Sequence, residues 1–175
     1  EGALRMKNLI LIGGTMGVGK TTVSRALQGL LPDCVFLDGD CCWDMRPFTV
    51  NEETKAMVQD NIVHLLRNFL RCSVYQNVVF CWVMHEQSII DGLLEQLSGE
   101  EFRLWNYSLT CPEEALRRRL EKDVREGKRT PDVIARSTAR LPLYEKLNTR
   151  RLDVGSTPAG EAAAAIAAQV REGQG

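Results

Sequence analysis

The chain has 175 residues, of which 44% are hydrophobic and 26% are charged. This length suits one domain, and the balance allows a buried core, which excludes a disordered tail and a fibrous repeat. No apolar run approaches the roughly 20 residues that a membrane-spanning helix needs, and the first residues lack the basic and apolar stretches of a secretion signal. We therefore predict one domain over residues 1–175, located in the cytoplasm and without a membrane anchor.

The formal net charge of -1 argues against a protein that binds nucleic acid, because that affinity comes mainly from lysine and arginine side chains that neutralise phosphates. The charge is unevenly distributed along the chain. Residues 117–140 hold nine basic and four acidic residues, so this segment is positive while the rest of the chain is negative. The segment is suited to holding a small anion.

Six cysteines are spread over the chain and form no pair of Cys-x-x-Cys motifs of the kind that indicates a zinc site. A chain of this length does not depend on disulfides for its stability. We interpret the cysteines as reduced thiols in a cytosolic protein.

Short apolar segments alternate with segments of helical spacing. In chain order, the sequence predicts strands over 8–12, 34–37, 77–84, 103–109 and 151–154, and helices over 20–30, 49–72, 86–97, 112–123, 132–146 and 161–170. Thr49 and Glu52 have the spacing of a capping box at the start of the long helix. The alternation predicts a parallel sheet with helices on both faces and a binding crevice beyond the carboxyl ends of the strands.

Residues 14–21 match the phosphate-loop pattern G-x-x-x-x-G-K-[ST] between the first expected strand and the first expected helix. In this pattern the glycines let backbone N–H groups surround a phosphate, and the helix amino terminus adds partial positive charge. Lys20 would reach the β- and γ-phosphates, and the Thr21 hydroxyl would be a Mg²⁺ ligand. The predicted nucleotide-binding residues of the loop are Gly14, Gly17, Val18, Gly19, Lys20, Thr21 and Thr22.

Asp38 and Asp40 flank Gly39 at the end of the second expected strand. Because they share a sheet edge with the phosphate loop, one carboxylate could bind Mg²⁺ and the other could orient or deprotonate an acceptor hydroxyl. In the alternative interpretation the aspartates only satisfy backbone donors in a turn. We favour the functional interpretation because the phosphate loop is so near in the expected fold.

The basic segment is a candidate for a flap over the phosphates, since cations brought by a closing flap stabilise a phosphoryl group in transfer and exclude water. Lys128 and Arg129 lie in the expected break between two helices, and Arg129 is the predicted catalytic cation. Arg118 and Arg119 lie nearer the base of the flap and are predicted to contact the adenine or ribose. A solvated charged face is the alternative interpretation.

Other candidates for the acceptor side are Trp43 and Arg46, after the second strand, and His85, after the third. The two tryptophans Trp43 and Trp82 could stack on a planar group, although we favour a core position for Trp82. No second histidine lies near His85 in the sequence, so it does not indicate a metal site.

The sequence resembles the small P-loop kinases of the shikimate kinase, gluconate kinase and adenylylsulfate kinase type. The resemblance extends over 7–170 and rests on the phosphate loop and four further motifs: F-L-D-G-D at 36–40, C-P-E-E-A-L-R-R-R-L at 111–120, K-R-T at 128–130 and A-R-L-P-L-Y-E at 139–145. It implies a three-layer α/β fold of five parallel strands in the order 2-3-1-4-5, with a small lid at about 123–136.

By the same resemblance, Asp38 lies near Mg²⁺, Asp40 contacts the acceptor, Arg129 or its neighbour acts from the lid, and Arg140 contacts the substrate. Arg136, on the same expected helix as Arg140, is a further predicted substrate contact. The chain departs from the family after the third strand, where no aspartate and no glycine-rich loop follows. The acceptor is therefore not expected to be shikimate.

Together these features predict a kinase that uses ATP and Mg²⁺ to phosphorylate a hydroxyl or phosphate of a small molecule, as a monomer or homodimer. A metabolite, a nucleoside or nucleotide, and an antibiotic all remain open as acceptors. The alternative is an ATP-binding regulatory module that hydrolyses ATP slowly and has no small acceptor. A nucleic-acid kinase fits less well, because the positive charge is confined to the expected lid.

Overall fold

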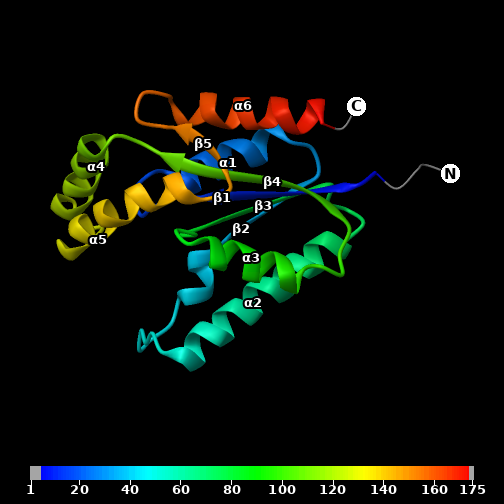
Figure 1. The fold of residues 1–175 in the computed structure, drawn as a ribbon, viewed down its shortest axis with the longest axis horizontal. Helices are drawn as coiled ribbons and strands as arrows, with labels where there is room; N and C mark the ends of the chain where they lie inside the picture. The colour runs from blue at the N-terminus through cyan, green and yellow to red at the C-terminus, as the bar shows by residue number, and fades with distance from the viewer. Residues whose placement is uncertain (1–4, 174–175) are drawn as a thin grey trace.

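A computed structural model of the protein describes residues 5–173. A parallel five-stranded sheet forms its centre, in the order β2-β3-β1-β4-β5, which confirms the predicted fold and strand order (Figure 1). The strands are β1 (Lys7–Gly13), β2 (Cys34–Asp38), β3 (Asn77–Trp82), β4 (Phe102–Thr110) and β5 (Arg150–Asp153).

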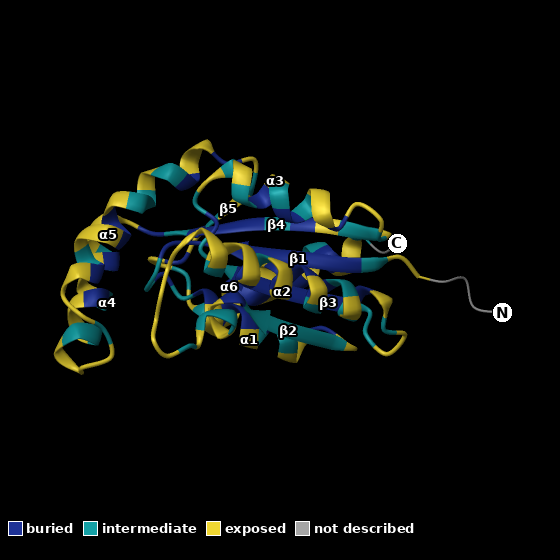
Figure 2. Cartoon of the chain, turned by 90° about the horizontal axis from the view of Figure 1, so that it is seen from below, coloured by how far each residue is buried: buried dark blue, intermediate teal, exposed yellow. Residues whose placement is uncertain are grey.

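Helices cover both faces of this sheet. They are α1 (Lys20–Leu30), α2 (Glu52–Arg71), α3 (Gln87–Gln96), α4 (Glu113–Arg125), α5 (Asp132–Arg140) and α6 (Ala159–Glu172), with 3-10 turns at Gly39–Trp43 and Leu141–Lys146. Helices α1 and α6 lie on one face and α2 and α3 on the other, whereas α4 and α5 project together beyond one end of the sheet (Figures 1 and 2). No helix in the described part of the chain is long and apolar enough to cross a membrane.

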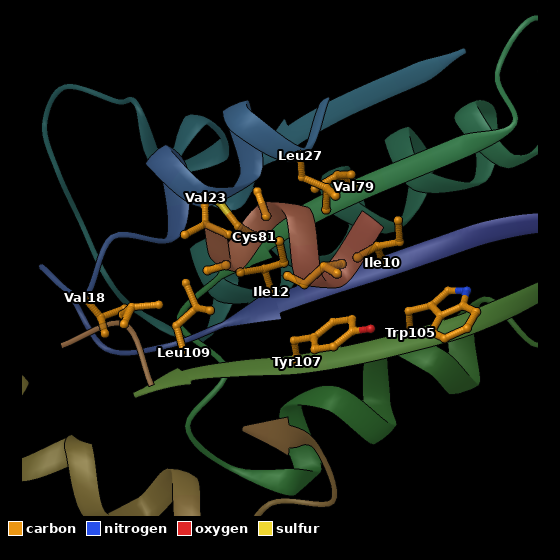
Figure 3. Close-up of a cluster of buried hydrophobic side chains, with 14 of the residues drawn as sticks. Ile10, Ile12, Val18, Val23, Leu27, Val79, Cys81, Trp105, Tyr107 and Leu109 are labelled. Atoms are coloured by element: carbon orange, nitrogen blue, oxygen red, sulfur yellow. The ribbon is translucent and has the colours of Figure 1, made fainter. Parts of the chain in front are cut away.

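The central strand separates two apolar cores. Alternate side chains of β1 face opposite sides, so Ile10 and Ile12 pack with α1 and α6 while Leu9 and Leu11 pack with α2 and α3. Figure 3 shows the first of these cores, with Val23 and Leu27 of α1 above Ile10 and Ile12. Each fully buried side chain of this type contributes about 1.5–3 kcal/mol. This double burial explains why β1 is an uninterrupted apolar run.

Two predicted helix boundaries were wrong. The long helix begins at Glu52, and its capping box joins the Asn51 side chain to the Thr54 amide at 2.9 Å and the Thr54 hydroxyl to the Asn51 amide at 3.0 Å, without Thr49. Asparagine is among the strongest N-cap residues, which explains the later start. The helix predicted over 132–146 is α5 followed by a 3-10 turn, because Pro142 lacks the N–H that would continue the α-helical ladder.

Candidate active site

The phosphate loop lies between β1 and α1, as the motif predicts. Gly17 has a φ of +83°, and a Cβ there would lie 2.4 Å from Leu120 Cδ2, so both the backbone and the packing require glycine. Gly19 is the N-cap of α1 and offers no side chain to its first amides. Within residues 5–173, no capping side chain therefore competes for these N–H groups, which are free to bind an anion.

Helix α5 supports this loop from the side. The Thr15 hydroxyl lies 2.8 Å from the Ser137 hydroxyl, which in turn donates to the Met16 carbonyl at 2.5 Å. Both Ser137 and Thr15 are buried. Sequence reasoning missed this pair. The sequence signal that could have revealed it was Ser137, a small polar residue between Arg136 and Arg140 on the helix face that has to be buried.

Lys20 is almost fully buried under the loop, and its ammonium donates to the Thr15 carbonyl at 3.1 Å. Burial lowers the pKa of Lys20, while the negative charge of Asp40, and to a lesser extent that of Asp38, opposes this shift. The lysine and the two aspartates predicted from separate motifs are thus electrostatically coupled at one sheet edge.

Asp38 links the loop to the turn after β2. Its carboxylate accepts from the Thr21 hydroxyl at 2.9 Å and from the Asp40 amide at 3.0 Å. Desolvation raises the pKa of Asp40, and the negative charge of Asp38 adds to this, whereas Lys20 and Arg129 act in the opposite direction. Asp38 therefore caps the 3-10 turn and also faces the phosphate loop. In the D-G-D segment, one aspartate thus satisfies a backbone donor and lies beside the phosphate loop at the same time.

The Thr21 hydroxyl and the Asp38 carboxylate are suited to a magnesium ion that is bound together with a nucleotide. Mg²⁺ is usually held by one or two carboxylates, phosphate oxygens and waters, not by a cage made of protein alone. Within 5–173 no group of three or more His, Cys, Asp or Glu side chains could hold a metal ion by itself. The Thr21 hydroxyl and the Asp38 carboxylate are adjacent and lie beside the phosphate loop, so they are the protein ligands that such an ion would use.

No acidic side chain of β3 replaces the aspartate that the sequence lacks at its end. Cys81 of β3 is the register partner of Asp38. Burial, and secondarily the charge of Asp38, raises the pKa of Cys81 to about 12, so the thiol stays protonated and neutral. The two aspartates beside the phosphate loop therefore come from the end of β2.

A large pocket of about 910 Å³ opens beside Asp40. It lies between the phosphate loop, the turn after β2, the end of β3 and the helices α2, α3 and α5. Five predicted substrate residues line it: Asp40, Trp43, His85, Arg136 and Arg140. Two do not: Asp38 faces Thr21, and Arg46 is exposed in the connection to α2.

A second pocket of about 380 Å³ lies on the other side of the phosphate loop and is lined in part by Gly17, Gly19 and Thr22. Arg119 also lines it and donates to the carbonyls of Val18 at 3.0 Å and Val154 at 2.7 Å.

Arg118 does not line either of these pockets. It is exposed and pairs with Glu114 at 3.4 Å along α4. One residue of helix turns a side chain by about 100°, so Arg118 and Arg119 cannot both face the loop.

The candidate lid joins α4 to α5. Arg129 lies there, its Nε 3.1 Å from the Asp123 carboxylate. The charge of Arg129 lowers the pKa of both Lys20 and Asp40, so its guanidinium is electrostatically coupled to these two side chains. Lys128 lines the smaller pocket.

His85 lies at the polar end of the large pocket, where its Nε2 is 3.6 Å from the Glu86 carboxylate. Burial, and secondarily the charge of Arg140, lowers the pKa of His85. The histidine is therefore neutral at neutral pH. Its buried Nδ1 has no hydrogen-bond partner among residues 5–173.

Trp82, for which we favoured a core position, packs against the core that faces α2 and α3, but it is only half-buried and also lines the large pocket. Its indole packs on the D-G-D turn so closely that a Cβ on Gly39 would lie 2.6 Å from Trp82 Cδ1. Gly39 is thus needed for this contact, which connects the pocket wall to the two aspartates.

The comparisons with known proteins agree with this architecture. A protein-family model described as an AAA domain matches residues 10–140. No curated protein sequence matches the chain.

Solved structures share the fold at low identity. The tunicamycin resistance protein of Deinococcus radiodurans is 21% identical, with a TM-score of 0.69 over 94% of this chain and 95% of that one. A gluconokinase from Sinorhizobium meliloti 1021 is 21% identical, with a TM-score of 0.66 over 97% and 96%. Shikimate kinase from Acinetobacter baumannii is 20% identical, with a TM-score of 0.61 over 96% and 94%.

The resemblance to small P-loop kinases is therefore confirmed at the level of the fold. The family model spans the phosphate loop, both aspartates and the basic segment up to Arg140. The chain belongs to this AAA-domain family.

Proposed function

We propose that the protein is an ATP-dependent kinase that transfers the γ-phosphate of ATP to a hydroxyl or phosphate group of a small molecule. The position of Asp40 carries this proposal. Asp40 lines the large pocket and is electrostatically coupled to the buried Lys20 of the phosphate loop. A molecule in that pocket would meet a carboxylate on the side that faces the terminal phosphate.

Each part of the site has a role in this reaction. The amides at the start of α1 and Lys20 would bind the β- and γ-phosphates. Thr21 and Asp38 would hold Mg²⁺, which neutralises phosphate charge when it is bound. The second, smaller pocket would hold the adenosine, and Arg119 would fix the loop next to it through its bonds to Val18 and Val154.

With a hydroxyl acceptor, one bond to the γ-phosphorus forms and another breaks. The acceptor oxygen forms a bond to the γ-phosphorus, and the bond from that phosphorus to the β–γ bridging oxygen breaks, so ADP leaves with the electron pair. The acceptor proton passes to Asp40, whose raised pKa makes it a better base than an ordinary aspartate. Arg129 would stabilise the charge that spreads over the transferred group.

The candidate acceptors comprise metabolites, nucleosides or nucleotides, and antibiotics. Among the structural neighbours are a gluconokinase, a shikimate kinase and a tunicamycin resistance protein. The shared fold supports phosphoryl transfer as the reaction but does not select among these classes.

The proposal is tested by incubating the protein with ATP, Mg²⁺ and pools of candidate acceptors while ADP release is measured, with a Lys20→Met variant as the control. We expect ADP release that depends on one pool and is lost in the variant. Nucleotide binding without stimulation by any pool would contradict the proposal and favour the regulatory module.

A further inference from the structure

The wall of the large pocket is mainly apolar. Three aromatic side chains line it: Trp43, Phe48 and Trp82. Trp43 and Phe48 form a tilted pair whose ring centroids are 6.0 Å apart. Val50, Ile62, Ile89 and Leu93 extend the apolar surface. The pocket therefore combines a charged end at Asp40 with an aromatic and aliphatic body.

The outer part of this wall is not covered by the protein itself. Phe48 is 68% exposed and Val50 is 54% exposed, and both lie in the connection between the 3-10 turn and α2. Large apolar side chains at the edge of a pocket leave apolar surface in contact with water. A ligand that covers this surface gains free energy. The two residues are positioned to close over an apolar part of a bound molecule.

The aromatic wall directly contacts the turn that carries the two aspartates. Trp82 packs on Gly39, which separates Asp38 from Asp40, and its ring also lies 6.1 Å from that of Phe80 in the core. A ring stacked on Trp82 would therefore be held at a fixed position relative to the Asp40 carboxylate. This geometry favours an acceptor whose apolar body sets the position of its reacting hydroxyl.

Two basic side chains on the pocket wall are already paired with carboxylates outside it. Lys55 lies 3.2 Å from Glu52, and Arg136 lies 3.1 Å from Asp132. A small polyol needs a hydrogen-bond partner for each hydroxyl that it buries, because an unsatisfied polar group is costly. The aromatic wall offers only the indole N–H groups of Trp43 and Trp82, which can donate but cannot accept.

We propose that the acceptor is an amphipathic alcohol with an aromatic ring system, whose hydroxyl faces Asp40 and whose ring lies against Trp43, Phe48 and Trp82. This inference rests on the proposed kinase function, and the transfer step is the one written above. The pocket volume of about 910 Å³ accommodates a molecule of drug size.

The test uses three alcohols that share a 1,2-diol head: 3-(2-naphthyl)propane-1,2-diol, 3-phenylpropane-1,2-diol, and glycerol, a triol in which a hydroxyl replaces the ring. Transfer of labelled phosphate from ATP gives kcat/KM for each. The variant is Phe48→Ser, and the matched control is Val74→Ser, which changes an apolar residue that is 64% exposed outside the pocket. Melting temperature and ATP affinity are measured for both variants to confirm that each is folded.

We expect kcat/KM to rise at least tenfold from glycerol to the naphthyl diol. Phe48→Ser should lower the value for the naphthyl diol about tenfold, which corresponds to about 1.4 kcal/mol, and leave that for glycerol unchanged. Val74→Ser should change neither. Glycerol used as well as the aromatic diols, or an equal effect of Phe48→Ser on all three, would overturn this inference alone. Absence of transfer to any diol and to any acceptor pool would overturn the kinase proposal as well.

Discussion

The two ends of the central sheet differ in how their buried polar groups are satisfied. At the amino ends of β1 and β3, the Asn8 side-chain amide donates to Oδ1 of Asn77 at 2.9 Å, and the Trp105 indole donates to Oδ1 of Asn8 at 3.0 Å. Asn77 in turn donates to the Pro32 carbonyl at 2.7 Å. Asn8 and Asn77 are fully buried, so this network is a closed structural unit.

The carboxyl ends are built differently. The Tyr144 hydroxyl and His85 Nδ1 are buried there without a hydrogen bond of normal geometry in the described part of the chain, and Lys20 is a buried cation. Apolar side chains at this end are exposed around a large pocket. The comparison indicates that the closed end contributes stability and the open end keeps groups available for ligands. The predictions below separate these two contributions.

The largest effect is expected from Lys20→Met. Removing the ammonium that would face the transferred phosphate should lower kcat about 10³-fold. Because burial lowers the pKa of Lys20, the fold bears a desolvation cost for this charge, so the melting temperature should equal or exceed that of the wild type. Phosphate-transfer assays and thermal melts check both parts. A variant that loses stability together with activity would mean that the open end is structural.

Asp40→Asn comes next, with a loss in kcat of about 10²-fold or more. In the wild type, activity should fall as pH decreases through the raised pKa of Asp40, because the base must be deprotonated. The charge of Asp38 raises this pKa and that of Arg129 lowers it. The midpoint of the acid limb should therefore move to lower pH in Asp38→Asn and to higher pH in Arg129→Gln. Midpoints that do not move would exclude Asp40 as the group that titrates.

At the closed end, Asn77→Ala should lower the free energy of unfolding by about 2–3 kcal/mol, because it leaves the buried Asn8 amide without its partner. The kcat of the folded fraction should not change. Urea titration measures the loss, with Asn61→Ala on the exposed face of α2 as the control. A large change in kcat without a change in the free energy of unfolding would contradict the structural role of the amino ends of the strands.

The smallest effect is expected from Tyr144→Phe. Burial raises the pKa of Tyr144, while Arg140 and the Gly14 amide lower it. The hydroxyl nevertheless has no well-formed hydrogen bond within residues 5–173. Its removal should therefore change the free energy of unfolding by less than about 0.5 kcal/mol. Tyr144→Ala should cost about 3–5 kcal/mol, because the ring is fully buried. Urea unfolding of both variants checks this. A loss above about 1.5 kcal/mol for Tyr144→Phe would reveal a satisfied hydroxyl.

Much of the architecture was predictable from local pattern. The apolar run of β1 and the glycines that follow it determine a buried strand, a tight loop and a helix start, because each depends on neighbours in the sequence. Boundaries were less predictable where two signals competed, as between Thr49 and Asn51 for the cap of α2. The D-G-D segment was ambiguous for the same reason, because a carboxylate can cap a turn and bind a ligand at once.

By itself the sequence determined the phosphate loop, the alternation of strands and helices, and the two aspartates after the second strand, whereas the order of the strands in the sheet was implied by the family resemblance. Only the tertiary structure decided which helix faces point inward, so it brought Arg119 to the loop and left Arg118 in solvent. It also decided that Trp82 and Phe48, which are 34 residues apart in the sequence, form one wall. The physical reason is that a pocket is a product of packing between distant elements, and no local propensity encodes it.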